Sequence, residues 1–168
     1  MNGAGGGRFP RSPDPVPVSK ALTPQAMLDV AIEQARIGLA EGGVPVGGAI
    51  FRADGTLLGA GRNRLVQHGD PSMHGETDAF RAAGRQPRYT DLILVTTLAP
   101  CRYCSGLISQ FRFQQVIVGD AVNAQGGIEM LRSQGIAILD LASPECIAMI
   151  GAFQRDHKDL WDECVGDG

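Results

Sequence analysis

Residues 92–104 read LILVTTLAPCRYC and join a strand-like run to the start of a helix. Residues 92–97 are mostly aliphatic or β-branched, with polar residues and a proline at their borders, which predicts a buried strand. Pro100 suits the turn that follows, and residues 102–111 are predicted to be helical. Cys101 and Cys104 are therefore expected at the N-terminus of a helix, where the helix dipole and free amide hydrogens stabilise thiolates.

Helix and strand signals alternate on both sides of this stretch. Thr23 and Pro24 are typical of a helix start, and Gly42-Gly43 ends that helix. Asp54-Gly55 is a hairpin turn signal. The other predicted elements are strands at 46–51, 57–61, 116–118 and 136–139, and helices at 73–83, 129–134 and 144–157.

This alternation predicts the α/β fold class, with one five-stranded sheet and helices on both of its faces. The first two strands are expected to pair antiparallel, and the later strands to be joined by helical crossovers. Residues 1–20 are rich in glycine and proline and are interpreted as a disordered tail. Residues 21–168 are expected to form a single domain.

The composition disfavours several classes of protein. The chain has 168 residues, of which 43% are hydrophobic and 20% charged, as in a globular protein. A net charge of −3 and only 5% aromatic residues argue against binding nucleic acid through its phosphates or by base stacking. We find no apolar run of about 18 residues and no secretory signal, and so expect a reducing, cytoplasmic location. There, the 4 cysteines are more typical of burial, catalysis or metal binding than of disulfides.

Two short motifs carry the candidate chemistry: His74-Gly75-Glu76 and Pro100-Cys101-x-x-Cys104. A lone histidine is more often a surface or core residue, and a lone Cys-x-x-Cys is compatible with a redox pair. Together, His74, Cys101 and Cys104 supply three ligands of the kind that Zn²⁺ prefers, and leave one of its four positions open. An open position is typical of a catalytic zinc rather than a structural one.

Glu76 is expected beside the open position without binding the metal. Zinc lowers the pKa of a bound water to about 7, and Glu76 is suited to carry a proton from that water to a leaving amine. The order His-x-Glu followed by Pro-Cys-x-x-Cys is the signature of zinc deaminases. We therefore predict a hydrolase that acts on C–N bonds and releases ammonia.

The chain resembles the fungal-type cytosine deaminases and their bacterial relatives. The matching stretches are GGVPVGG at 42–48, His74-Gly75-Glu76, TTLAPC at 96–101 with Cys104, and Val118-Gly119. The resemblance covers about residues 24–166. It implies a three-layer α/β/α fold with a mixed sheet, a zinc cofactor, a homodimer, and a role in pyrimidine salvage with cytosine as the substrate.

The resemblance also implies roles for individual residues. His74, Cys101 and Cys104 would bind zinc, and Glu76 would be the proton shuttle. The other expected substrate contacts are the Asn63 side chain and the Gly75 amide, both on the base carbonyl, the Ala99 carbonyl near the water, and Trp161 over the ring. A tail at residues 160–166 would form a short helix over the site.

Two positions depart from the family pattern. Cys164, preceded by Asp162 and Glu163, stands where an aspartate usually binds the exocyclic amine, and Ala124 replaces an aromatic residue that stacks on the ring. Isocytosine, creatinine, guanine or a triazine are therefore alternative substrates. Cys164 is alternatively a small residue in a mobile tail or a fourth zinc ligand, whereas Cys146 is interpreted as core.

Two further hypotheses belong to other classes. Residues 68–72 (HGDPS) are faintly similar to tRNA adenosine deaminases, but the net charge and the glycine after His74 disfavour a nucleic acid partner. A zinc fold used only for binding would have no need of Glu76. No membrane partner is expected.

Overall fold

The computed structural model describes residues 22–166. In chain order, the elements are α1 (Pro24–Ala40), β1 (Gly47–Arg52), β2 (Leu57–Arg62), α2 (Leu65–His68), α3 (Gly75–Ala83), β3 (Leu92–Thr96), α4 (Arg102–Phe111), β4 (Gln115–Val118), α5 (Ile128–Ser133), β5 (Ala137–Asp140), α6 (Pro144–Asp156) and α7 (Lys158–Val165).

The strands form a five-stranded sheet in the order β2-β1-β3-β4-β5. β1 pairs antiparallel with both β2 and β3, whereas β3, β4 and β5 run parallel. The sheet is therefore mixed, as predicted. The tight turn around Asp54 and Gly55 joins β1 to β2, and helices α4 and α5 make the crossovers between the parallel strands.

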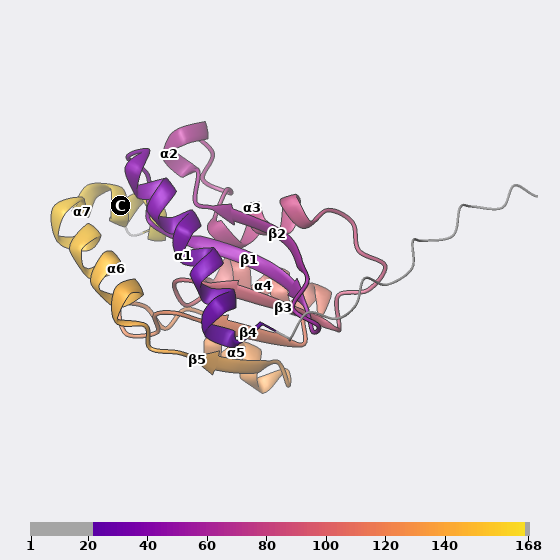
Figure 1. The fold of residues 1–168 in the computed structure, drawn as a ribbon. Helices are drawn as coiled ribbons and strands as arrows, with labels where there is room; N and C mark the ends of the chain where they lie inside the picture. Colours follow the sequence, from indigo (N-terminus) through magenta and orange to yellow (C-terminus); the bar gives the residue numbers. More distant parts are fainter. Residues whose placement is uncertain (1–21, 167–168) are drawn as a thin grey trace, which may run out of the picture.

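Side chains of the central strands alternate between the two faces of this sheet, as the pleat requires. Leu94 and Val116 pack on the face that carries α3, α4 and α5. Val95 and Ile117 pack on the opposite face, with α1 and α6. Figure 1 shows α1 in front of the sheet and α4 and α5 behind it. The predicted three-layer α/β/α fold is confirmed.

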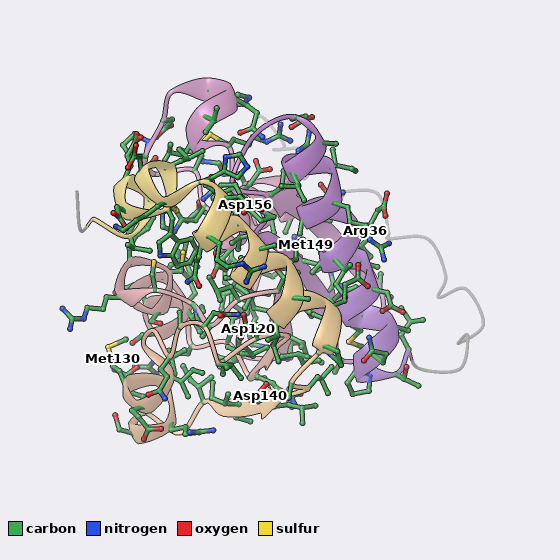
Figure 2. All side chains as sticks on the ribbon, turned by 90° about the vertical axis from the view of Figure 1, so that its left-hand side faces the viewer. Arg36, Asp120, Met130, Asp140, Met149 and Asp156 are labelled. Carbon is green, nitrogen blue, oxygen red and sulfur yellow. The ribbon has the colours of Figure 1, made fainter. Side chains whose placement is uncertain are left out.

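Helices α1 and α6 lie side by side on their face of the sheet, with Met149 between them (Figure 2). Arg36 of α1 forms an ion pair with Glu145 of α6, with 2.7 Å between nitrogen and oxygen. Both side chains are about half exposed, so the burial of apolar residues rather than this pair holds the helices together. Cys146 of α6 is only 1% exposed in this layer, which confirms its prediction as core.

The predicted helix starts are confirmed by their hydrogen bonds. The Thr23 side chain accepts from the Ala26 N–H at 3.2 Å, and Ser143 accepts from the Cys146 N–H at 3.4 Å. Each strand and each long helix lies within about two residues of its predicted position. No helix within residues 22–166 is both long and apolar enough to cross a membrane.

Two features differ from the sequence expectations, the start of α3 and the presence of α2. Helix α3 begins at Gly75 rather than at residue 73, because His74 has an extended backbone with φ −80° and ψ 165°. The short helix α2 was not predicted. The C-terminal segment forms α7, the short helix that the family resemblance implied. The predicted tail at residues 1–20 lies outside the described residues.

Glycines on β1 and β2 let two helices approach the sheet closely. A Cβ atom at Gly47 would overlap the Ala31 carbonyl oxygen of α1. On the other face, a Cβ atom at Gly48 would lie 2.7 Å from the Gly75 oxygen of α3, and one at Gly61 would lie 2.5 Å from the Ala79 nitrogen. Any side chain at these positions would push a helix away from the strands.

We predict that Gly47→Ala destabilises the protein by about 3 kcal/mol, because α1 must move to admit the new methyl group. Gly106→Ala is the matched control, since the same methyl group on α4 meets no atom within 4 Å. That variant should be neutral or more stable by up to about 1 kcal/mol, because alanine favours a helix over glycine. Urea unfolding measures both, and equal effects would contradict the close approach of α1 and β1.

Candidate functional site

His74, Cys101 and Cys104 meet where α3 and α4 begin. The His74 Nδ1 atom lies 3.5 Å from the sulfur of Cys101 and 3.5 Å from that of Cys104. Their ligand atoms all lie within 4.8 Å of one another. His74 immediately precedes α3, Cys101 is the N-cap of α4, and Cys104 lies in the first turn of α4. Residues 27 positions apart in the sequence thus form one cluster.

This cluster depends on the way the two helices are mounted on the sheet. A Cβ atom at Gly75 would lie 2.8 Å from the Val46 oxygen, so glycine brings the start of α3 against β1. Strand β3 ends at Thr96, and the turn through Pro100 starts α4 beside it. The ring of Tyr103 then packs edge-on against the His74 ring, with centroids 5.6 Å apart.

The three donors fit a zinc ion. Zn–S bonds of about 2.3 Å and a Zn–N bond of about 2.0 Å that meet at a tetrahedral angle place nitrogen and sulfur about 3.5 Å apart. The two measured separations of 3.5 Å match this value. Within residues 22–166, no fourth metal-binding side chain joins the cluster, which leaves one coordination position for water or substrate.

Proton sharing among the three side chains agrees with a metal-binding role. A hydrogen bond from the Cys104 thiol holds the pKa of Cys101 well below its usual value, and the same bond and burial raise the pKa of Cys104. The pKa of His74 is raised, chiefly by its hydrogen bond to the Cys101 sulfur. A divalent metal ion that binds here would displace these protons. Its positive charge would then stabilise the two thiolates in their place.

Glu76 lies in the first turn of α3 and is only 3% exposed. Burial, followed by the negative charge of Cys101, raises the pKa of its carboxyl group. A raised carboxyl pKa brings proton uptake and release closer to neutral pH, as a proton shuttle requires. His74 and Glu76 line the same pocket, although only His74 belongs to the metal-binding cluster.

A pocket of about 840 Å³ opens over the cluster. The sequence-predicted residues that line it are Asn63, His74, Glu76, Ala99, Cys101, Trp161, Glu163 and Cys164. Three other predicted residues lie outside this lining. Cys104 is buried behind it, the Gly75 backbone packs on β1, and the Asp162 carboxylate pairs with Lys158 on α7.

The pocket also has walls that the sequence reasoning did not assign. Pro71 and Ser72 precede His74, and Arg102 and Tyr103 lie between the two cysteines, so adjacency to the motifs was the available signal. Val46, Leu98 and Gly126 are further unassigned residues of the lining. Ala124, Val165 and Gly166 also line the pocket, where the family resemblance had placed them. Val165 and Gly166 reach the pocket because α7 lies over it, which the family resemblance implied but no local sequence signal indicates.

Asn63 is 1% exposed and is held rigidly. Its N–H donates to the Val46 carbonyl at 2.8 Å, and its Oδ1 atom accepts from the Leu65 N–H at 3.0 Å. Because an N–H must donate to oxygen, this second bond settles the orientation of the side-chain amide. The Asn63 NH₂ group is left to face Cys164, whose sulfur lies 3.6 Å away.

Asp78 fixes the chain on both sides of Asn63. Its Oδ2 atom accepts from the Arg62 N–H at 3.0 Å and from Arg64 Nε at 2.8 Å. Asp78 therefore ties the segment that carries Asn63 to α3, which also carries Glu76.

Cys164 closes the pocket from α7. Burial raises the pKa of its thiol to about 11, so the group is neutral at physiological pH. It lies against Asn63 and does not belong to the metal-binding cluster. The side chain is half-buried among the apolar residues that hold α7, including Trp161 and Leu160.

Ala124 lies on a loop anchored by a buried carboxylate. Asp120, which is completely buried, accepts from the N–H groups of Val122 and Asn123 at 2.7 and 3.0 Å. The Asn123 side chain donates to Asp120 at 2.7 Å and to the Ile147 carbonyl of α6 at 3.0 Å. Figure 2 shows Asp120 beneath α6. The pocket wall at Ala124 is therefore fixed to the helix that leads into α7.

Comparisons with known proteins agree with this geometry. The model of the cytidine and deoxycytidylate deaminase zinc-binding region matches residues 22–120. The cytosine deaminase of Candida albicans is 37% identical over 142 residues, which cover 83% of this chain and 95% of that protein. A tRNA-specific adenosine deaminase of Streptococcus pyogenes serotype M1 is 32% identical over 104 residues, 60% of each chain.

Among solved structures, a guanine deaminase from Nitrosomonas europaea superposes with a TM-score of 0.69 and 21% identity, over 87% of this chain and 100% of that one. At this identity the likeness concerns the fold. The family match covers more than half of the chain and includes His74, Glu76, Cys101 and Cys104. Together with the zinc-binding geometry, it shows that the chain belongs to the family of proteins with the cytidine and deoxycytidylate deaminase zinc-binding region and is a zinc-dependent hydrolase of C–N bonds.

Proposed function

We propose that this enzyme deaminates a small free heterocyclic base, with cytosine as the first candidate, and releases ammonia. The observation that carries the proposal is the fixed NH₂ group of Asn63, which faces the pocket as a hydrogen-bond donor. A ring carbonyl such as that of cytosine is the matching acceptor. The 37% identity to a cytosine deaminase over most of the chain supports the same substrate.

In the proposed deamination, each residue of the site has a separate role. Zinc held by His74, Cys101 and Cys104 would lower the pKa of a bound water molecule, so that this water gives up a proton near neutral pH. Glu76 accepts the proton of the attacking water and delivers it to the ring nitrogen beside the amine-bearing carbon. Glu76 then takes the proton of the hydroxyl group now on that carbon and passes it to the amine. The C–N bond breaks as the C=O bond forms, and ammonia leaves. Asn63 holds the ring in register, and Trp161 covers it.

A free base fits the pocket better than a nucleic acid strand. Arg102 is the only lysine or arginine among the lining residues of the described chain, so phosphates find little positive charge. Helix α7 adds Trp161, Cys164 and Val165 to the walls, where a longer substrate would have to pass.

A larger or differently substituted ring is the second candidate. Ala124 and Cys164 both line the pocket. A methyl group at 124 leaves more space than an aromatic ring would, and a neutral thiol at 164 is a weak acceptor for an amine. These two positions make isocytosine, creatinine, guanine and a triazine the alternative substrates to test beside cytosine.

The homodimer and the place in pyrimidine salvage remain predictions from the family resemblance, and the cytoplasmic location remains a prediction from the sequence. Gel filtration with light scattering measures the first directly.

We predict that an ammonia-release assay on free bases, nucleosides and oligonucleotides detects turnover of a free base, with cytosine the fastest. Isocytosine, creatinine, guanine and a triazine are included so that turnover of one of them instead assigns the second candidate. Turnover restricted to nucleosides or to tRNA would contradict the proposal of a free-base substrate.

We predict that Asn63→Asp lowers kcat/KM for the best substrate by about 100-fold, because a charge-bearing acceptor replaces the donor while the bond to the Leu65 N–H is kept. Zinc content should not change. Gln114→Glu is the matched control, since it makes the same chemical change on an exposed residue outside the pocket. Full activity of Asn63→Asp would show that the amide does not bind the substrate.

We predict that Glu76→Gln keeps zinc but lowers kcat by about a thousandfold, because the amide cannot carry the proton. Cys101→Ser is the opposite control and should lose zinc, which metal analysis of the purified variants measures. An active Glu76→Gln variant that retains metal would rule out the shuttle role.

A further inference from the structure

The hydroxyl group of Thr77 lies between the metal ligand His74 and the turn that precedes it. Thr77 is the third residue of α3 and is only 5% exposed. Its Oγ1 atom accepts a hydrogen bond from the His74 N–H at 2.9 Å. Its one proton is shared between two acceptors, the Ser72 carbonyl oxygen at 2.9 Å and the His74 carbonyl oxygen at 3.0 Å.

The turn at residues 70–72 is itself tied down. The Asp70 Oδ1 atom accepts from the Ser72 N–H at 2.8 Å and from the Ser72 hydroxyl at 2.6 Å. The Ser72 carbonyl accepts from the His74 N–H at 3.1 Å as well as from Thr77. The His74 ring also hydrogen-bonds to the Pro71 backbone. Both the main chain and the ring of His74 are thus held by this turn.

His74 needs such support because it stands outside the helix. As the N-cap of α3, it is held by the helix only through its carbonyl, which accepts from the Asp78 N–H at 2.9 Å. Its own N–H and its extended dihedrals lie outside the hydrogen-bond ladder of α3. A rotation about its backbone dihedrals would carry Nδ1 away from the two sulfurs, which are mounted separately on α4. The position of the imidazole relative to the thiols is therefore set by whatever fixes the His74 main chain.

We propose that Thr77 is a positioning residue for zinc: its hydroxyl, bridging the Ser72 carbonyl and the His74 N–H, holds His74 in the orientation that completes the metal site. The role needs one group that both donates and accepts. Valine has nearly the same shape as threonine but offers neither function, whereas serine keeps both. This role is independent of which base the enzyme deaminates.

The test measures how fast zinc leaves the purified protein in the presence of an excess of a coloured chelator. We expect Thr77→Val to release zinc at least about tenfold faster than the native protein, which is the scale of effect seen when an outer partner of a metal ligand is lost. Thr77→Ser should restore slow release. With Co²⁺ in place of zinc, the visible absorption bands of Thr77→Val should shift, since the nitrogen ligand changes its geometry.

Ser143→Ala separates this role from a general loss of stability. Ser143 is 6% exposed and caps α6 through one hydrogen bond to the Cys146 N–H, and it does not line the pocket. The variant should lower the melting temperature but release zinc at the native rate. Thr77→Val with native zinc release, or Ser143→Ala with release as fast as that of Thr77→Val, would overturn the proposal.

Asp70→Ala tests the same support from the surface and serves if Thr77→Val does not fold. It removes both bonds that Asp70 makes to Ser72, while the hydroxyl of Thr77 remains. We expect faster zinc release from this variant too, with a smaller change than in Thr77→Val. Release at the native rate from Asp70→Ala would show that the turn does not hold Thr77 and His74 in place, and would overturn the proposal.

Discussion

The close contact of the first hairpin with α3 is the constraint on which the rest of the site depends. Gly48 and Gly61 leave no side chain between the strands and the helix, so backbone meets backbone across this interface. The start of α3 is thereby fixed relative to the sheet, and β3 fixes the start of α4 on the same face. His74 and the two cysteines meet because two helix N-termini are mounted on one rigid sheet, not because any of the three residues attracts the others.

Much of this arrangement follows from sequence because its signals are local. The spacing of Cys101 and Cys104 at a strand-to-helix turn, and the hairpin turn at Asp54-Gly55, define their structures without reference to distant residues. The start of α3 was misplaced by two residues because apolar Met73 reads as helical, while the Thr77 hydroxyl holds His74 in an extended conformation. A hydrogen bond of this kind does not change the spacing of apolar residues, so the hydrophobic pattern does not reveal where α3 begins.

The far wall of the pocket was accessible only through family resemblance or through the structure. Asn63 and Cys164 are 101 positions apart, and their contact depends on how α7 packs on Ile150, Phe153 and Leu98. Asp162 and Glu163 precede Cys164, yet one pairs with Lys158 along α7 and the other lines the pocket. This packing decides which side of α7 faces the pocket. The sequence of α7, which is acidic and has one tryptophan, does not indicate that side.

Asp120 and Asn123 hold the backbone of the loop that carries residue 124, so the side chain at this position can be replaced without loss of the anchor. The side chains of Asp120 and Asn123 hydrogen-bond to the loop backbone, to each other and to α6. None of these hydrogen bonds involves the side chain at 124. The thiol at 164 is likewise outside the metal cluster. Substitutions at 124 and 164 would therefore change the walls of the pocket while the metal-binding side chains and Glu76 keep their positions.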